Sequence, residues 1–165
     1  MSYPRAMRLG IVSDTHGLVR PALFGAFDGV DEILHAGDVG DEEVIAMLET
    51  LAPVRAVRGN VDGPDLPESL EFELAGHKFA MAHGHLFAAK NRHRTLTRAF
   101  PKANFILYGH THVPVLEVLA GITIINPGSA GSKRFKLPVT CGILELPENG
   151  SVGETYSWNL LDLEV

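Results

Sequence analysis

A pair of histidines one residue apart is the part of the chain best suited to chemistry. His110 and His112 follow Gly109, at the end of the apolar run Phe105 to Tyr108. In an extended backbone, residues i and i+2 point to the same side, so the two imidazoles can converge on one point. Histidine is the commonest metal ligand among side chains. The pair therefore indicates a metal site, with an ordinary turn as the alternative for an isolated His-x-His.

Four other segments end an apolar run in the same way, with a potential ligand beside a glycine. Asp14 and His16 follow the run Leu9 to Val12, and they share the i, i+2 spacing of the first pair. The other polar ends are Gly37-Asp38, Gly59-Asn60 and His83-Gly84-His85. Each motif is weak alone, because Asn and Asp also favour turns. Together, at the same kind of position, they indicate one shared site for metal ions.

Strand and helix patterns alternate in the first third of the chain. The expected strands are Leu9 to Ser13, Val30 to His35 and Val54 to Arg58, and the expected helices are Pro21 to Phe27 and a segment from Asp41 onward. This alternation implies right-handed crossovers and a parallel sheet, in which ligands collect at the carboxyl ends of the strands. Asp41, Glu42 and Glu43 fit a helix cap and first turn, so we assign them a structural role rather than metal binding.

After Pro64 the pattern is mostly that of β-hairpins. The expected pairs are Leu70 to Leu74 with Lys78 to Ala82, Val113 to Leu119 with Ile122 to Ile125, and Val139 to Leu146 with Ser151 to Trp158. His77 falls in the first turn and is expected to face solvent. The segment Asn91 to Phe100 is a basic helix, with its arginines on a solvated face and His93 on the surface without a partner. These elements predict one domain over residues 1–165, with an α/β fold in which helices flank a two-layer β-sandwich of mixed sheets.

The composition is that of a globular protein of 165 residues with a formal net charge of −6. This charge argues against general affinity for nucleic acid, but it allows a phosphate-containing substrate because bound cations would set the local field. The single cysteine, Cys141, lies in an apolar run and is expected as a small buried hydrophobe. The apolar run after Arg8 is too short for a signal peptide or a membrane span, so a cytoplasmic location is expected.

Collected in order, the motifs resemble the pattern of the calcineurin-like metallophosphoesterase superfamily, which is D-x-H, G-D, G-N, a histidine and G-H-x-H. The likeness runs from about Leu9 to Ser129. The short chain and the segments His83-Gly84-His85 and Asn126-Pro127-Gly128-Ser129 are similar to small bacterial and archaeal phosphodiesterases of the YfcE/MJ0936 type. The eukaryotic retromer subunit Vps29 shares that fold. The resemblance implies an αββα sandwich.

The resemblance also implies a centre of two divalent metal ions. By motif position, the ligands are Asp14, His16 and His112 for one ion and Asn60, His83 and His110 for the other, with Asp38 bridging them. Oxygen and nitrogen ligands without a thiolate suit borderline ions, of which Mn²⁺ is expected and Fe²⁺, Zn²⁺ and Ni²⁺ are alternatives. Two ions about 3.5–4 Å apart can clamp a phosphoryl group and provide a metal-bound hydroxide as the nucleophile.

One departure from the superfamily pattern bears on the chemistry. Many members have a histidine directly after the asparagine of G-N, proposed as the general acid, whereas this chain has Val61. General acid catalysis contributes about 10²–10⁴-fold, so slow turnover or activated leaving groups are expected, and the change favours a diesterase. Three residues are expected around the ligands: His85 to contact substrate or fill a turn, Asp62 to orient a ligand or stabilise a turn, and Asn126 to stabilise a loop.

The leading hypothesis is a dinuclear metal-dependent phosphodiesterase that hydrolyses a small phosphodiester. Its specificity is expected to come from Leu86 to Arg94 and Ser129 to Lys136. A phosphomonoesterase is the alternative within the enzyme class, and a non-catalytic protein-binding scaffold of the Vps29 type is the alternative from another class. Vps29-like proteins have an eroded metal set, whereas every ligand position here carries a competent side chain, which favours an enzyme. A homo-oligomer is implied by the resemblance only.

Overall fold

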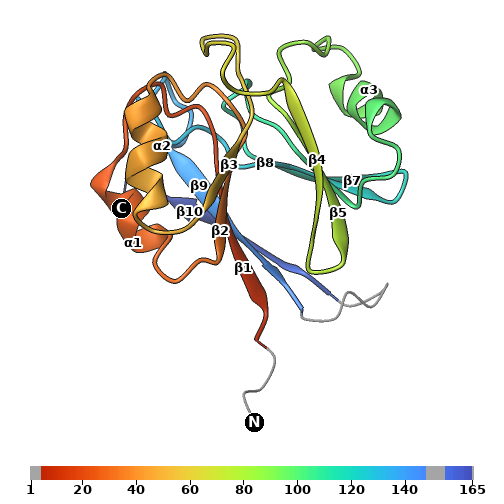
Figure 1. Cartoon of the computed structure of the whole chain (residues 1–165). Coiled ribbons are helices and arrows are strands. Elements are labelled where there is room, and N and C mark those ends of the chain that lie inside the picture. The colour runs from red at the N-terminus through yellow and green to blue at the C-terminus, as the bar shows by residue number, and fades with distance from the viewer. Residues whose placement is uncertain (1–4, 148–154, 165) are drawn as a thin grey trace.

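Two five-stranded sheets pack together in the computed structural model, which describes residues 5–147 and 155–164 (Figure 1). The first sheet has the order β10-β9-β1-β2-β3, and its strands are β1 (Met7–Val12), β2 (Glu32–His35), β3 (Val54–Ala56), β9 (Thr140–Leu146) and β10 (Ser157–Asp162). Strands β1, β2 and β3 are parallel. They are joined through the helices α1 (Pro21–Ala26) and α2 (Glu42–Glu49), as the alternating pattern predicts.

The second sheet has the order β4-β5-β6-β8-β7. Its strands are β4 (Ser69–Leu74), β5 (His77–Ala82), β6 (Phe105–Leu107), β7 (Val115–Leu119) and β8 (Ile122–Asn126). Strands β5, β6 and β8 are parallel, and the helix α3 (Arg92–Ala99) connects β5 to β6. Because parallel strands end at the same edge of a sheet, the loops after the parallel strands of each sheet are gathered at one edge.

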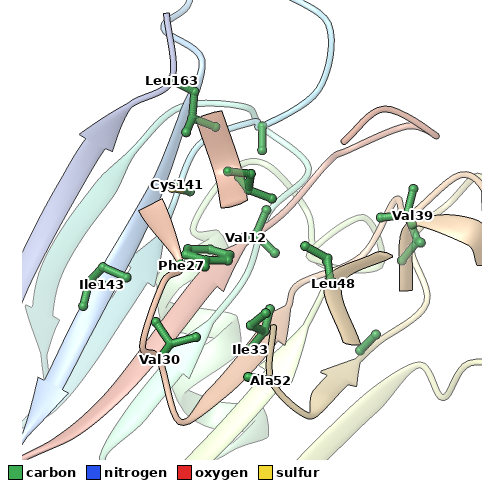
Figure 2. Packing of buried hydrophobic residues seen from close by; sticks show 14 of the residues in the cluster. Val12, Phe27, Val30, Ile33, Val39, Leu48, Ala52, Cys141, Ile143 and Leu163 are labelled. Atoms are coloured by element: carbon green, nitrogen blue, oxygen red, sulfur yellow. The ribbon is translucent and has the colours of Figure 1, made fainter. Parts of the chain in front are cut away.

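Apolar side chains fill three layers of this arrangement. On the outer face of the first sheet, Phe27 of the segment after α1 and Leu48 of α2 pack against Ile33 of β2 (Figure 2). A second cluster, which includes Phe79 and Leu107, draws on strands of both sheets and fills the space between them. A third cluster lies between α3 and the outer face of the second sheet. The order of helix, sheet, sheet and helix confirms the predicted sandwich.

The structure also decides smaller expectations. Cys141 is fully buried, as expected, and burial raises the pKa of its thiol to about 12. The predicted strand Ser151 to Trp158 is displaced, because β10 covers Ser157–Asp162, while 151–154 lie outside the described residues. The expectation for His77 is wrong: it opens β5, half-buried, with its ring centroid 5.6 Å from that of Phe105. Within the described residues, no helix is long and apolar enough to cross a membrane.

Candidate metal centre

The loops after the parallel strands carry the candidate ligands, and their backbone is unusual. Positive φ angles occur at Asp14 (56°), His16 (48°), Asp38 (53°), His110 (66°) and His112 (61°). Residues with a side chain rarely adopt this left-handed conformation, because the Cβ atom is crowded there. Backbone strain of this kind costs about 1–3 kcal/mol per residue and is typical of functional sites. Its concentration on these residues therefore marks the strand ends as a site.

Asp14 is fully buried, and its two carboxylate oxygens have different surroundings. Oδ2 accepts hydrogen bonds from Ser13 Oγ at 2.7 Å and from the His110 N–H at 3.1 Å. Oδ1 has no hydrogen-bond partner among the described residues. It lies 3.2 Å from Nε2 of His112 and 3.8 Å from Nε2 of His16. One oxygen thus fixes the carboxylate, and the other is directed at these two imidazoles and at that of His83.

Asp38 is held in the same way. Its Oδ1 accepts a hydrogen bond from the Val61 N–H at 3.1 Å, and its Oδ2 lies 3.3 Å from Nε2 of His83 and 3.5 Å from Nε2 of His16. Burial alone would raise the pKa of Asp38, but the contact with His83, the charge of that ring and the Val61 N–H outweigh burial and lower it to about 2. The carboxylate is therefore ionised at neutral pH, which is the form that binds a cation.

His83 is almost fully buried and presents Nε2 to both carboxylates. Its Nδ1 donates a hydrogen bond to the carbonyl oxygen of Ala36 at 2.8 Å, so in the neutral ring the lone pair is on Nε2. Nε2 lies 3.7 Å from Oδ1 of Asp14 as well as close to Asp38. Burial favours the neutral ring, but these carboxylates and the Ala36 carbonyl outweigh it and raise the pKa of His83. A ring N–H donated to a backbone carbonyl is the usual way to orient a metal-binding histidine.

Two glycines of the motifs are required for close approach to the aspartates. A Cβ atom on Gly59 would overlap Oδ1 of Asp38, and a Cβ atom on Gly109 would overlap Ser13 Oγ and the Asp14 carboxylate. Any side chain at either position would displace a carboxylate oxygen that is held by hydrogen bonds. Packing against the aspartates therefore explains the glycines of the G-N and G-H motifs.

The donor atoms fit divalent ions in spacing and in chemistry. Two ligands about 2.1 Å from one ion lie about 3.0 Å apart at a right angle and about 3.4 Å apart in a tetrahedron. The carboxylate–imidazole separations of 3.2–3.8 Å come close to these values. The donor atoms form two close groups, which are Asp14, His16 and His112, and Asp14, Asp38 and His83. Several of these atoms are buried without a hydrogen-bond partner in the described part of the chain, which is costly unless a cation binds them.

Asn60 and His110 lie at the margin of this set. Asn60 is exposed and directly precedes Val61 in the loop after β3. The ring centroid of His110 is 5.2 Å from that of His83 and 6.3 Å from that of His85. Burial and then the charge of His83 lower the pKa of His110, so its ring is neutral at pH 7, the form that a metal requires. The structure does not bring His110 into either close group of donor atoms.

His85 lies beside the candidate ligands. Its ring centroid is 5.4 Å from that of His83, and its Nδ1 is buried without a hydrogen-bond partner among the described residues. Burial and then the charge of His83 lower its pKa. Contact with substrate and filling of a turn both stay predictions for His85.

Asp62 joins two of the ligand-bearing loops. Its carboxylate accepts hydrogen bonds from the N–H groups of Val39 at 3.1 Å, Gly40 at 2.9 Å and Gly59 at 2.8 Å. These residues belong to the loops after β2 and β3, which carry Asp38 and Asn60. The bond from Gly59 agrees with the predicted turn role of Asp62, and the bonds from Val39 and Gly40 also join the two loops.

Asn126 supports the loop that contains His110 and His112. It is fully buried, and its Nδ2 donates hydrogen bonds to the carbonyl oxygen of Gly109 at 2.9 Å and to Oγ1 of Thr111 at 3.0 Å. These hydrogen bonds agree with the predicted role of Asn126 in stabilising a loop, which stays a prediction.

His35, at the end of β2, is a supporting residue that sequence reasoning missed. Its Nδ1 accepts a hydrogen bond from the Gly37 N–H at 3.2 Å, so its Nε2–H donates to Oγ1 of Thr15 at 3.0 Å. Thr15 in turn donates to the Val39 carbonyl at 2.9 Å. Complete burial lowers the pKa of His35 to about 4 and keeps the ring neutral. A histidine at the end of a strand, just before the Gly37-Asp38 motif, was the available signal.

His93 is partly exposed and has two partners that the sequence did not indicate. Its Nε2 lies 2.7 Å from the hydroxyl of Tyr108, and its Nδ1 is paired with the carboxylate of Glu117. Tyr108 directly precedes Gly109, and Glu117 lies on β7. The partners are distant in sequence, so they were not visible from the helix pattern around His93.

Comparisons with known proteins agree with this geometry. Residues 7–149 match the model of the family described as "Calcineurin-like phosphoesterase superfamily domain". A "Probable metallophosphoesterase" from Methanothermobacter thermautotrophicus is 34% identical over 141 residues, which are 80% of this chain and 82% of that protein. "Phosphodiesterase MJ0936" from Methanocaldococcus jannaschii is 31% identical over 162 residues, which are 84% of this chain and 93% of that protein.

The fold has a close counterpart among solved structures. A Vps29 from Entamoeba histolytica, complexed with zinc, has a TM-score of 0.76 and 22% identity, over 95% of this chain and 99% of that one. This likeness shows the fold alone. The family match, in contrast, spans every strand end that carries a candidate ligand, so the chain belongs to the calcineurin-like phosphoesterase superfamily.

Proposed function

We propose that this protein is a metal-dependent phosphodiesterase that hydrolyses a small phosphodiester at a centre of two divalent ions. One observation carries the proposal. Asp14 and Asp38 each use one oxygen for hydrogen bonds with the protein and direct the other at histidine Nε2 atoms. Membership of the superfamily supports this function, as does the name phosphodiesterase of the relative from Methanocaldococcus jannaschii.

The candidate ligands divide between the two ions. We assign Asp14, His16 and His112 to the first ion and Asn60, His83 and His110 to the second, with Asp38 between them. Mn²⁺ suits this oxygen and nitrogen set, and Fe²⁺, Zn²⁺ and Ni²⁺ are alternatives. When bound, such ions polarise phosphoryl oxygens and lower the pKa of a coordinated water to about 7.

Candidate ligands of the site have the protonation states that metal binding requires, but the position after Asn60 provides no general acid. Asp38 is ionised and His110 is neutral at pH 7, so both have the protonation state that a cation requires. Val61 is 53% exposed beside Asp38 and has no ionisable group. A leaving alkoxide receives no proton from this position, so esters with good leaving groups should react faster than simple alkyl esters.

A scaffold of the Vps29 type is the second candidate, because the fold is shared with Vps29. The side chains at the seven motif positions disfavour it. Each is a carboxylate, an imidazole or an amide that can bind a metal, and a pure scaffold has no need to bury unpartnered donor atoms at such cost.

Hydrolysis of two model esters tests these alternatives. The protein is loaded with Mn²⁺ and assayed with bis-p-nitrophenyl phosphate and p-nitrophenyl phosphate, with a chelated sample as the control. We expect metal-dependent hydrolysis, and a higher kcat/KM for the diester. Faster hydrolysis of the monoester would make the protein a phosphomonoesterase. If neither ester is hydrolysed in a metal-dependent way, the protein-binding scaffold is the remaining candidate function.

A further inference from the structure

Arg92, the first residue of α3, is a half-buried cation that has no counterion within the described part of the chain. Its Nε donates a hydrogen bond to the carbonyl oxygen of Phe87 at 3.2 Å. No carboxylate lies within 4.0 Å of it among the described residues. By contrast, the partly buried Arg55 and Arg58 are each paired with a glutamate. The Phe87 carbonyl therefore orients the guanidinium, while its terminal nitrogens stay available for an anion.

This guanidinium lies next to the candidate metal centre. A Cβ atom on Gly84, between His83 and His85, would lie 3.7 Å from Cδ of Arg92. Arg92 is thus close to the loop that carries His83, which we assign to the second ion.

Arg92 also lines a groove of about 400 Å³. Residues that line the groove include Asn91, Arg92, His93, Arg94, Tyr108 and Glu117. The one acid among these, Glu117, is paired with His93. The two guanidinium groups of Arg92 and Arg94 outnumber this single carboxylate among the lining residues. The volume lies within the range of small-molecule sites.

We propose that this groove is a substrate subsite for a second phosphate group, and that Arg92 is the residue that determines specificity for it. This inference rests on the proposed function and names the substrate class, which is a phosphodiester that carries a further phosphate monoester. The ions would bind the reacting diester, and Arg92 with Arg94 would bind the dianionic phosphate through charge-assisted hydrogen bonds.

A matched pair of substrates tests the proposal. The p-nitrophenyl ester of thymidine phosphate is compared with the same ester bearing a second phosphate on the sugar. We expect wild type to prefer the second ester by about tenfold in kcat/KM, through a lower KM. Arg92→Gln should abolish this preference, and Arg92→Lys, which keeps the charge, should retain part of it. Arg98→Gln, an exposed change in the last turn of α3, should leave it intact.

Two results would overturn the subsite: equal kcat/KM values for the two esters with wild type, or an unchanged preference in Arg92→Gln. A binding measurement separates this failure from failure of the proposed function. If wild type hydrolyses neither ester, calorimetric titration of the Mn²⁺-loaded protein with thymidine bisphosphate and thymidine monophosphate decides the subsite alone. Tighter binding of the bisphosphate that is lost in Arg92→Gln would support it, and equal affinities would refute it.

Discussion

The helices α2 and α3 have the same length, and each connects two neighbouring parallel strands of a sheet. Their first turns carry side chains of opposite charge. Each has eight residues and follows a strand end that carries a candidate ligand. The α2 helix starts with Asp41, whose side chain accepts a hydrogen bond from the Glu43 N–H at 3.0 Å. The α3 helix starts after Asn91, which has a φ of 63° and makes no capping hydrogen bond with its side chain, and Arg92 follows directly.

This difference separates residues that serve the helix from residues that serve the site. Acids at a helix N-terminus are stabilised by the helix dipole, so Glu42 and Glu43 need no functional explanation. The same dipole disfavours Arg92 and Arg94 by about 0.3–1 kcal/mol each. Binding of an anion by the two arginines would explain why they occupy these unfavourable positions. Substitutions near α2 and substitutions near α3 therefore test this distinction separately.

The largest effect is expected at Asp38, which belongs to the strand end before α2 and contacts His83 from the strand end before α3. Asp38→Asn keeps the volume and the acceptor for the Val61 N–H but removes the charge that faces His83 and His16. We expect kcat/KM to fall by about 10²–10³-fold and the binding of both ions to weaken, because the carboxylate faces His83 and His16, which we assign to different ions. Elemental analysis and circular dichroism check this. Two ions per chain in the variant would contradict the bridging role.

The side with α2 contains a buried histidine that should make stability depend on pH. The pKa of His35 is lowered from 6.5 to about 4 in the folded protein, so the unfolded chain binds more protons between these values. Stability is therefore complete above pH 6.5 and decreases as the pH falls towards 4, by about 2 kcal/mol between pH 7.5 and 5.

Urea unfolding of the chelated protein at the two pH values measures this change. His35→Gln keeps an acceptor for the Gly37 N–H and a donor for Thr15, and it should remove the contribution of His35 to the slope. An equal dependence on pH in wild type and variant would mean that His35 does not titrate as described.

The contrast between the helices also shows what the sequence can and cannot predict. The strand ends with Asp14, Asp38 and His110 were predictable, because an apolar run, a glycine and a polar residue are adjacent in sequence. The cap at Asp41 was predictable for the same reason, since it depends on the residues that follow it. The partners of His93 were not predictable, because Glu117 lies on β7, the second strand after the helix that carries His93.

The same physical limit applies to the other errors. The position of β10 depends on its pairing with β9, in which Trp158 lies opposite Leu144, and the alternation of side chains alone did not fix its start. His77 is partly covered by Phe105 of a neighbouring strand. Sequence patterns therefore predicted the local chemistry of the site, while contacts made across strands had to come from the structure.

On the side with α3, Asn126 should affect metal binding without touching an ion. Asn126→Ala removes the hydrogen bonds to the Gly109 carbonyl and Thr111 Oγ1 that support the loop of His110 and His112. We expect Mn²⁺ affinity to fall by about tenfold, as for other residues that orient ligands. Thr111→Val keeps the bond to Gly109, so its effect should be smaller. Mn²⁺ titration measures this. An unchanged Mn²⁺ affinity in Asn126→Ala would show that Asn126 does not position the loop of His110 and His112 for metal binding.

The cap of α2 should matter for stability alone. Asp41→Ala removes the acceptor for the Glu43 N–H and is expected to lower the free energy of unfolding by about 1 kcal/mol. Asp41→Asn keeps an acceptor and should cost less. Neither change should alter kcat/KM for bis-p-nitrophenyl phosphate, and a large loss of activity would place this helix in the site after all.

The smallest effect is the most specific to α3. Arg94 is exposed near the start of the helix and Arg98 lies in its last turn, so the dipole acts on them with opposite sign. Arg94→Glu should raise the free energy of unfolding by about 0.3–1 kcal/mol and lower the preference for the diester with a second phosphate. Arg98→Glu should decrease stability and leave the preference unchanged. If Arg94→Glu stabilises the protein without any loss of preference, Arg94 does not bind the second phosphate, and Arg92 alone accounts for the preference.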